Sequence, residues 1–525
     1  MSDSAINHAP GVLAPGHLGE LTRVVPFEMV DAALETAGGK EQRVRRLPSR
    51  VVVYLLLAGV LFADQGWKQI FSRLVSGLPT PLKNPTASSL SQAMRRVGPA
   101  PLRELFTLLK GPAVTGNRQV TRFAGRLVVA IDGTQIAVAD TEANRARYPK
   151  PRGGPNGEAG YPMLRMVAIL TAGTRSVIEA AFGTDAVGEL SYAHQIVSCL
   201  HSGMVLLGDR NFATYAFCRD VADTGADFLF RAKSAATAMK LPVLRLLPDG
   251  SYLSNAAGLP VRVIDAELTV TTEKGTTHAD YRLITTLLDP RQAPALGLVT
   301  LYHERWQIET AYCELKALIL GGRVLRGRHP GAVIQEMWAL LTCYQVLRTA
   351  MTDVTLRHPG VDPDRLSFGI GLRAARDQVI QTRGILAGTV IDLVGRIGAA
   401  VLAEPMPARR IRTRPRVIKR AISKYRAKER NADRRTYPAT LTTKILPPDP
   451  ALKPNGIADN RVRPADQNVF QAIKALCATV GWNTSSQADA SQIASWHGLP
   501  VTGITAAELR PRRAGGHAPR RGRRS

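Results

Sequence analysis

The spacing of apolar residues changes along this chain, from a helical pattern to short continuous runs typical of strands. In residues 24–120 the apolar side chains recur at helical spacing, most clearly within residues 86–98, where they are Leu90, Ala93, Met94 and Val97. Thr86 or Ser88 is the expected N-cap of that helix, and Gly98 is its expected stop. We therefore predict that residues 24–120 form a helical domain.

After residue 120, short apolar runs rich in β-branched residues replace the helical spacing. Residues 126–134 (RLVVAIDGT) and 204–212 (MVLLGDRNF) are too short for typical helices, and each run leads to an aspartate. The predicted elements in chain order are strands at 126–134, 161–173 and 176–184, a helix at 189–200, a strand at 204–212, a helix at 214–226 and a strand at 227–233. Such an order predicts a mixed sheet that brings its acidic residues to one edge.

A second group of strands is predicted before the next helix. Within about 235–295, four segments are bounded by Pro, Gly and Asp residues, namely residues 242–247, 251–255, 260–270 and 279–288. We expect them to form an all-β insertion between the sheet and the helix that follows it.

Polar side chains recur at helical spacing in residues 301–318 (LYHERWQIETAYCELKAL). At steps of 3, 4, 3 and 4 they share one helix face, and they are Tyr302, Arg305, Glu309, Tyr312 and Lys316. A carboxylate held between Arg and Lys suits a metal ion and a phosphate in the same place. The alternative is a solvated helix stabilised by i,i+4 pairs such as Arg305 with Glu309.

The two strand aspartates, Asp132 and Asp209, extend this pattern. With Glu309 they could converge on a pair of divalent cations, which stabilise the attacking and leaving oxygens of a phosphoryl displacement. Each aspartate alone has a simpler explanation. Asp132 precedes Gly133, a common hairpin-turn pair, and Asp209 could cap the following helix.

Taken together, these motifs resemble a known family. The order Asp132, Asp209, Glu309, with the glutamate inside Y-x-x-R-x-x-x-E-x-x-x-x-x-x-K, resembles the DDE transposases of bacterial insertion sequences, specifically the family named after insertion sequence four. The blocks IDGT, GDRNF and DFLFRAK resemble its other core motifs. VPFEMVDAAL, LPSRVVVYLLLAGVLF and SSLSQAMRRVG resemble its N-terminal domain, so that the resemblance covers residues 24–445.

The resemblance implies a mechanism and its partners. Asp132, Asp209 and Glu309 would hold two Mg²⁺ or Mn²⁺ ions for DNA cleavage and strand transfer in an RNase H-like core. Arg305 and Lys316, with Tyr302, would contact DNA near the scissile phosphate. The partners would be double-stranded terminal inverted repeats and target DNA, bound by a homodimer. Two alternatives remain, an RNase H-like nuclease or resolvase without strand transfer and a non-catalytic DNA-binding relative.

Other residues compete for these roles. The further acids near the motifs are Asp140, Glu142, Asp185, Glu189, Glu304 and Glu314. Glu304 and Glu314 lie off the polar stripe, and Asp185 and Glu189 precede a helix, where capping is the simpler explanation. Trp306 either stacks on an extruded base or packs the helix onto the sheet, and we favour packing.

Charge agrees with a nucleic-acid partner. The formal net charge is +27, and the sequence pI is near 10.4. Residues 409–435 contribute +11 and residues 510–524 add seven Arg, so these two segments supply 18 of the 27 charges. Solvated tails are the alternative, but a DNA-cutting core favours phosphate contact. Arg95 and Arg96, at the end of a helix, could read DNA ends or simply face solvent.

The expected fold class is α/β multidomain. We predict a leader (1–23), a helical N-terminal DNA-binding domain (24–120), an RNase H-like core (121–350) with a β-rich insertion (about 235–295), a helical basic C-terminal region (351–445), and a linker with an Arg-rich, disordered tail (446–525).

The cellular setting is predicted from what the sequence lacks. The five cysteines show no metal-ligand spacing, and the first ten residues do not resemble a secretion signal. The apolar run at residues 51–63 falls short of the ~20 residues that a membrane span requires. We expect a cytoplasmic, nucleoid-associated bacterial protein with no membrane partner.

Overall fold

In the computed structural model, the described residues are 18–39, 41, 43, 45–76, 84–111, 122–151, 160–233, 239–381, 395–407, 412–413, 419–422, 425–428 and 437–448. Most of the basic segment at 409–435, the whole of the one at 510–524 and nearly all of the expected tail lie outside them.

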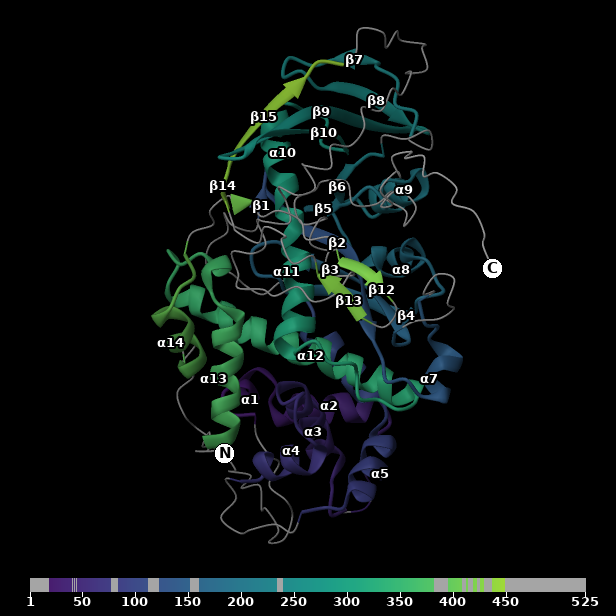
Figure 1. The fold of residues 1–525 in the computed structure, drawn as a ribbon, viewed down its shortest axis with the longest axis vertical. Helices are drawn as coiled ribbons and strands as arrows, with labels where there is room; N and C mark the ends of the chain where they lie inside the picture. Colours follow the sequence, from purple (N-terminus) through teal and green to yellow (C-terminus); the bar gives the residue numbers. More distant parts are fainter. Residues whose placement is uncertain are drawn as a thin grey trace, which may run out of the picture.

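A mixed sheet of eleven strands runs through the molecule (Figure 1). Its core strands are β2 (Arg126–Ala137), β3 (Met163–Thr171), β4 (Val177–Thr184), β5 (Met204–Gly208) and β6 (Asp227–Arg231), and the short β1 (Arg122–Phe123) pairs with β2. In the order β4-β3-β2-β5-β6, β2 is antiparallel to β3 and parallel to β5, and β5 is parallel to β6. The predicted order of strands and helices is therefore confirmed.

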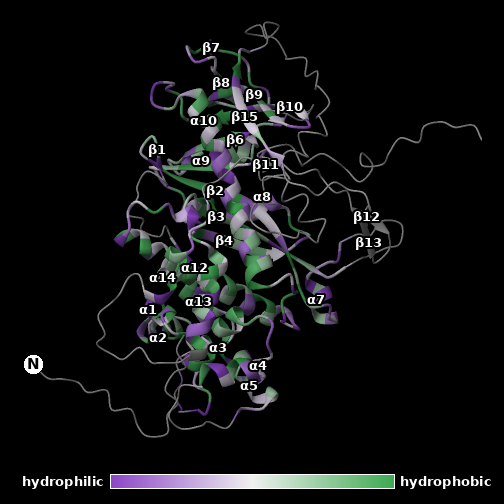
Figure 2. Ribbon diagram, turned by 60° about the vertical axis from the view of Figure 1, so that its left-hand side comes forward, coloured by the Kyte–Doolittle hydropathy of each residue, from purple (hydrophilic) through white to green (hydrophobic). Residues whose placement is uncertain are grey.

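Helices cover both faces of this sheet. Successive side chains of a strand point to opposite faces, and β2 shows this alternation. Val129 and Ile131 pack with α8 (Glu189–Ile196) and α9 (Tyr215–Asp223), while Val128 and Ala130 belong to a second core. That second core includes α11 (Gln307–Cys313) and α12 (Pro330–Arg357), so helices pack on both faces of the sheet. Figure 2 shows many hydrophobic residues in α12 and in the N-terminal helices beside it.

The N-terminal region is helical, as predicted. Its helices are α1 (Leu21–Val24), α2 (Phe27–Thr36), α3 (Ser49–Leu61), α4 (Trp67–Leu74), α5 (Ala87–Val97) and α6 (Ala100–Leu109). Thr86 caps α5 by accepting a hydrogen bond from the Ser89 amide, and Gly98 ends it at a φ of 64°. The apolar helix α3 is buried against α12, which explains why it lacks a polar face. None of the helices in the described ranges has the length and apolarity needed to span a membrane.

The β insertion continues the core sheet. Its strands are β7 (Arg245–Leu246), β8 (Tyr252–Ala256), β9 (Leu259–Thr272) and β10 (Gly275–Thr285). β10 pairs with β6 on one side and with β9 on the other, so one hydrogen-bonded sheet extends from the core to the top of Figure 1.

The C-terminal region, predicted to be helical and basic over residues 351–445, contains strands as well as helices. Helices α13 (Phe368–Gln381) and α14 (Gly395–Ala403) are followed by strands: β11 (Arg412–Thr413), β12 (Lys419–Ile422), β13 (Tyr425–Lys428), β14 (Tyr437–Pro438) and β15 (Thr440–Leu446). β15 pairs antiparallel with β9, from Thr440 opposite Thr271 to Leu446 opposite Asp265. The prediction did not include these strands, of which β15 joins the insertion sheet and the others pair in two short two-stranded sheets.

Candidate active site

The polar stripe lies on a segment that changes its helical geometry three times. It begins in α10 (Ala295–Tyr302), passes through a 3-10 turn (η2, His303–Trp306) and α11, and ends in a π-helix (η3, Glu314–Ile319). The expectation of one regular helix was therefore wrong in detail, because 3-10 and π turns contain fewer and more residues per turn than an α-helix.

The stripe faces the sheet and not the solvent. Tyr302 and Arg305 are each 1% exposed, and Glu309 is 3% exposed. α11 packs on β2, and the Tyr312 hydroxyl donates a hydrogen bond to the backbone carbonyl of Asp132. The alternative of a solvated helix is excluded by this burial.

Arg305 joins the strand carboxylate to the helix carboxylate. One guanidinium nitrogen donates to Asp132 Oδ2 at 3.3 Å, and another donates to Glu309 Oε1 at 2.8 Å. The i,i+4 pair expected between Arg305 and Glu309 is thus present, but it is buried. Two turns further along, Lys316 Nζ donates to Thr134 Oγ1 at 3.1 Å. The stripe therefore contacts β2 at Asp132 and two residues beyond it.

Asp132 lies inside β2, which continues to Ala137 as the partner of β3, so the hairpin-turn alternative is wrong. The parallel pairing of β2 with β5 ends with Ala130 opposite Leu207. Two residues further along each strand stand Asp132 and Asp209, on strands that neighbour at about 4.8 Å. The sheet register therefore brings the two aspartates together.

Asp209 is held by the turn that follows β5. Its Oδ1 accepts a hydrogen bond of 2.8 Å from the Asn211 amide. The next helix, α9, is capped by Thr214, whose hydroxyl accepts from the Phe217 amide. The capping explanation for Asp209 is thereby excluded.

Charge and burial at this point raise the pKa of Asp132 to about 7. Burial is the main cause, and the negative charge of Asp209 adds to it, while Arg305 opposes both. Tyr302 is similarly affected, since burial raises the pKa of its hydroxyl to about 12 against the opposing charge of Arg305. The site thus combines several ionisable groups out of contact with bulk water.

A fourth carboxylate, Glu189, belongs to this site. A Cβ atom added to Gly133 would lie 1.9 Å from Glu189 Oε1, and Asn211 Nδ2 donates to Glu189 Oε2 at 3.4 Å. Burial raises the pKa of Glu189 to about 8, with further contributions from the charges of Asp132 and Asp209. The capping explanation missed this residue; a glycine inside a strand, at position 133, is the signal that indicates a close approach.

The other acids considered from the sequence have different partners. Asp140 pairs with Arg145 and Lys150, and Asp185 accepts hydrogen bonds from the Gln135 amide. Glu142 stands in the first turn of α7 (Glu142–Arg147), Glu304 accepts from Gln307, and Glu314 pairs with Arg175 and Arg348. Trp306 is half-buried, and its carbonyl accepts from the Thr310 hydroxyl.

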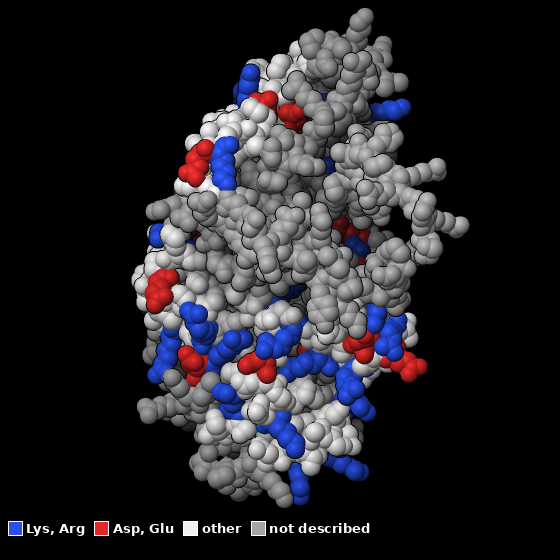
Figure 3. All heavy atoms as spheres, in the orientation of Figure 1, with Lys and Arg blue, Asp and Glu red and all other residues white. Residues whose placement is uncertain are grey.

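Arg95 and Arg96 lie on α5, among the N-terminal helices. Both side chains are exposed, but Arg96 also donates to the Leu47 carbonyl at 2.6 Å and pairs with Glu41 at 3.0 Å. Figure 3 shows Lys and Arg side chains gathered over the helical, lower half of one face of the molecule. Of the two arginines, Arg95 is therefore the better candidate for contact with DNA.

The donor chemistry of the site suits a divalent metal ion, because carboxylate oxygens are the ligands that Mg²⁺ prefers. In the ranges that the structure describes, no three His, Cys, Asp or Glu side chains are arranged to hold a metal ion. Between Asp132 and Glu309, the positive charge is that of the Arg305 guanidinium. The residue types therefore fit a metal, and in this structure an arginine bridges two of them.

Comparison with known proteins identifies two domains. A family model described as "Insertion element 4 transposase N-terminal" matches residues 15–107, and one described as "Transposase DDE domain" matches residues 123–346. Asp132, Asp209 and Glu309 all lie inside the second match.

Individual relatives agree with these matches. "Transposase InsG for insertion sequence element IS4" of Escherichia coli K12 is 26% identical over 412 residues, which cover 76% of this chain and 91% of that protein. "Putative transposase InsZ" of the same strain is 25% identical over 190 residues, covering 36% of this chain and 62% of that one. Among solved structures, a piggyBac transposase synaptic complex with hairpin DNA is similar at a TM-score of 0.39 and 11% identity, covering 73% of this chain and 84% of that one.

Proposed function

Because this chain is a DNA transposase that belongs to the DDE family named after insertion sequence four, we propose that Asp132, Asp209 and Glu309 are its catalytic carboxylates. The observation that carries this proposal is their convergence. The register of β2 and β5 aligns the two aspartates, and Arg305 links Asp132 to Glu309. We propose that the sheet and helices around them are an RNase H-like core, on the strand order described above.

DDE transposases use divalent metal ions, and we propose that the three carboxylates hold two, Mg²⁺ or Mn²⁺. When bound, such ions stabilise the attacking and leaving oxygens of an in-line phosphoryl displacement. Asp132 and Glu309 are buried, so their negative charges are poorly solvated and favour a cation. The mechanism requires no covalent bond between the protein and DNA, and the joining step uses a DNA 3′-hydroxyl.

The basic residues of the stripe bind the DNA strand. We propose that Arg305 and Lys316 contact the phosphate next to the scissile bond, since Arg305 ends beside Asp132 and Lys316 ends beside Thr134, two residues further along β2. The positive charge of Arg305 acts on the Tyr302 hydroxyl and opposes the rise of its pKa on burial, which supports a role for the phenol beside the guanidinium. We include Glu189 as a fourth carboxylate that borders the same space.

The N-terminal helices and the basic segments would complete DNA binding. We propose that Arg95 contributes to recognition of the terminal inverted repeats and that residues 409–435 and 510–524 contact phosphates of repeat and target DNA alike. We expect a homodimer on DNA, because two ends must be cut and joined together, and a cytoplasmic location on the bacterial nucleoid.

The test replaces each carboxylate by its amide. Asp132→Asn, Asp209→Asn and Glu309→Gln should each abolish Mg²⁺-dependent nicking at the ends of the element while binding to the same DNA persists. Asp140→Asn is the matched control, because Asp140 pairs with Arg145 and Lys150, neither of which belongs to the proposed catalytic set. A wild-type cleavage rate in any of the three would remove that residue from the catalytic set.

A second substrate distinguishes a transposase from a nuclease. A pre-cleaved end with a free 3′-hydroxyl should be joined to target DNA by the wild-type protein and by the Asp140→Asn variant. Cleavage without any joined product would support the alternative of a nuclease or resolvase on the same fold.

A further inference from the structure

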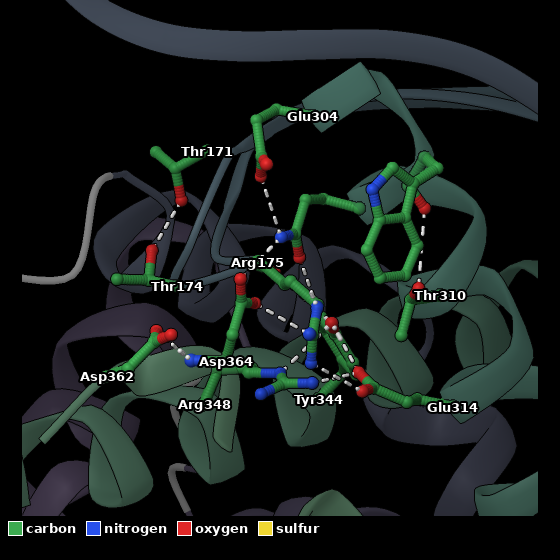
Figure 4. Close-up of polar contacts among 12 residues, drawn as sticks. Thr171, Thr174, Arg175, Glu304, Thr310, Glu314, Tyr344, Arg348, Asp362 and Asp364 are labelled. Carbon is green, nitrogen blue, oxygen red and sulfur yellow. Dashed lines mark hydrogen bonds and ion pairs between the residues drawn. The ribbon is translucent and has the colours of Figure 1, made fainter. Parts of the chain in front are cut away.

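A buried cluster of charged side chains lies behind the catalytic helix (Figure 4). Its centre is Arg175, in the turn between β3 and β4, which is 3% exposed. The three ends of its guanidinium donate to Gln307 Oε1 at 2.7 Å, Glu314 Oε1 at 3.1 Å and Asp364 Oδ1 at 2.7 Å. A single side chain thus joins the sheet to the helix and to the 3-10 turn at Pro363–Arg365 (η4).

Glu314 receives further support from α12. Arg348 forms an ion pair with Glu314, and the Tyr344 hydroxyl donates to Glu314 Oε2 at 3.0 Å. The same hydroxyl oxygen lies 3.2 Å from the carbonyl of Arg175, which is an alternative acceptor for its single hydrogen. The two arginines balance the two acids, Glu314 and Asp364, so the four buried charges sum to zero.

The cluster contacts the helix on the face opposite the active site. Gln307 and Glu314 are seven residues apart, which places them nearly in line on a helix. Glu309 is two residues after Gln307, or roughly 200° around the axis. Arg305 and Asp132 therefore hold the helix from the sheet side, and Arg175 holds it from behind.

Glu314 is also the first residue of the π-helix, which ends at Ile319. A π turn is rarely stable alone and is found mostly at functional sites. Here it follows Glu309 and itself contains Lys316, whose ammonium donates to Thr134. Fixing Glu314 therefore fixes the point at which the helix widens, and with it the approach of Lys316 to β2.

The backbone conformation of Arg175 is unusual, which indicates that its surroundings hold this residue in a defined place. Its φ is 56°, a left-handed conformation that is uncommon for a residue other than glycine. Hydroxyl contacts among Thr171, Thr174 and Ser176 hold the turn in this shape. Such a conformation persists only where the surroundings determine it.

We propose that Arg175 is a positioning residue of the transposase, which sets the place of Glu309 and Lys316 by anchoring Gln307 and Glu314 from behind. This inference rests on the proposed role of Glu309. Arg175 affects the rate of cleavage by holding the helix in place, in addition to any contribution that it makes to the stability of the fold.

The experiment compares two buried arginines. Arg175→Lys keeps the charge but cannot reach three acceptors at once, because an ammonium lacks the fork of a guanidinium. Arg262→Lys is the matched control: Arg262 is 0% exposed and also has several partners, but it lies in the insertion, where it donates to Ser251, Leu287 and Ala293 and pairs with Asp249. Asp364→Asn is a milder change at the same cluster, should Arg175→Lys fail to fold.

Four quantities are measured on each protein: the melting temperature, the affinity for terminal-repeat DNA, the single-turnover cleavage rate at saturating DNA, and hydrogen exchange of residues 303–320. Arg175→Lys should cleave roughly tenfold to a hundredfold more slowly, as expected for a displaced catalytic group. Its DNA affinity should stay within about twofold, and exchange in residues 303–320 should increase. Arg262→Lys should have a lower melting temperature and unchanged DNA affinity, cleavage rate and hydrogen exchange. Asp364→Asn should change the cleavage rate and the hydrogen exchange in the same direction as Arg175→Lys.

Two results would overturn the inference. One is unchanged cleavage and unchanged exchange in residues 303–320 for both Arg175→Lys and Asp364→Asn. The other is an equal loss of cleavage in Arg262→Lys at an equal loss of melting temperature, which would mark the effect as one of stability. Asp132→Asn is measured in the same series as a test of the catalytic centre itself. If that variant still cleaves DNA, the proposed catalytic role of the carboxylates is refuted. The hydrogen exchange of residues 303–320 then decides whether Arg175 positions the helix.

Discussion

The substitution Gly133→Ala tests the role of the Glu189 carboxylate by displacing it, without replacing Glu189 itself. The added Cβ would lie 1.9 Å from Glu189 Oε1 and 2.8 Å from its Cδ, so the carboxylate must turn away from the site. Gly133 does not have a positive φ, and alanine can adopt its backbone conformation without strain. The substitution should therefore displace Glu189 and leave the strand in place.

The expected change in stability is small. Replacing glycine by alanine inside a strand contributes about 0.5–1 kcal/mol of stability. A strained rotamer of Glu189 costs about 0.5–1.5 kcal/mol in the other direction, and the bond lost to Asn211 is long at 3.4 Å. The sum lies within about 1 kcal/mol of zero. Gly208→Ala is the contrast, because its Cβ would meet the buried ring of Phe230 at 2.9 Å, and overpacking a core costs about 1–3 kcal/mol.

The assay combines thermal unfolding with cleavage of terminal-repeat DNA. Gly133→Ala should unfold near the wild-type temperature but cleave at least tenfold more slowly, a loss of about 1.4 kcal/mol in transition-state stabilisation. Glu189→Gln should show a similar loss, and the double variant should lose little more, since both changes remove one group. Losses that multiply in the double variant would show that Gly133 acts independently of Glu189. Wild-type rates in both single variants would place Glu189 outside the reacting site.

Three further predictions concern the surface and pH. Arg96→Ala should lower the melting temperature, because this side chain is bonded within the N-terminal region, whereas Arg95→Ala should weaken DNA binding in a mobility-shift assay and leave melting unchanged. Deleting residues 510–525 should lower affinity for terminal and random duplex alike in a salt titration, with the slope reduced by about 0.9 per lost contact; a lost preference with an unchanged slope would contradict this. Burial lowers the pKa of His303 from 6.5 to about 4, so its neutral form favours the folded state and that stability is lost as pH falls from 6.5 through 4. In His303→Gln, the free energy of unfolding, measured by urea unfolding at each pH, should fall by at most ~3 kcal/mol less than in the wild type over this pH range. If the free energy depends on pH in the same way in both proteins, the lowered pKa of His303 is refuted.

The local pattern of the sequence was sufficient for the elements that carry the acids. Short β-branched runs predicted β2 and β5, and the spacing from Tyr302 to Lys316 predicted a helix with one functional face. Both signals are local, because a strand or helix repeats within a few residues. The 3-10 and π turns inside that helix were not predicted; Glu314, where the π turn begins, contacts Arg175, which is 139 residues away in the sequence.

The parts missed in the site depend on close approaches in space. Glu189 begins α8 and looked like a capping residue, and only the fold brings it to Gly133. Asp132-Gly133 looked like a turn, because the two residues alone do not reveal that β2 continues past them, paired with β3. The contacts of Arg96 with Leu47 and Glu41 were also not visible in the sequence, and its contact with DNA stays a prediction. In each case the contact is made by a residue that is distant in the sequence.

The pairing of β15 with β9 has a consequence for the order in which the molecule assembles. Thr440 lies opposite Thr271, so 169 residues separate the two ends of this contact (440 − 271). Pairings across such distances form late, because a long loop must close before any bond is gained. During synthesis the preceding strands can fold first, while one edge of β9 stays open until β15 is made. A chain truncated before β15 would keep that edge exposed, and an exposed strand edge readily pairs with another molecule. Among the described strands, β15 therefore protects the sheet of a full-length chain from an association to which a truncated chain would be prone.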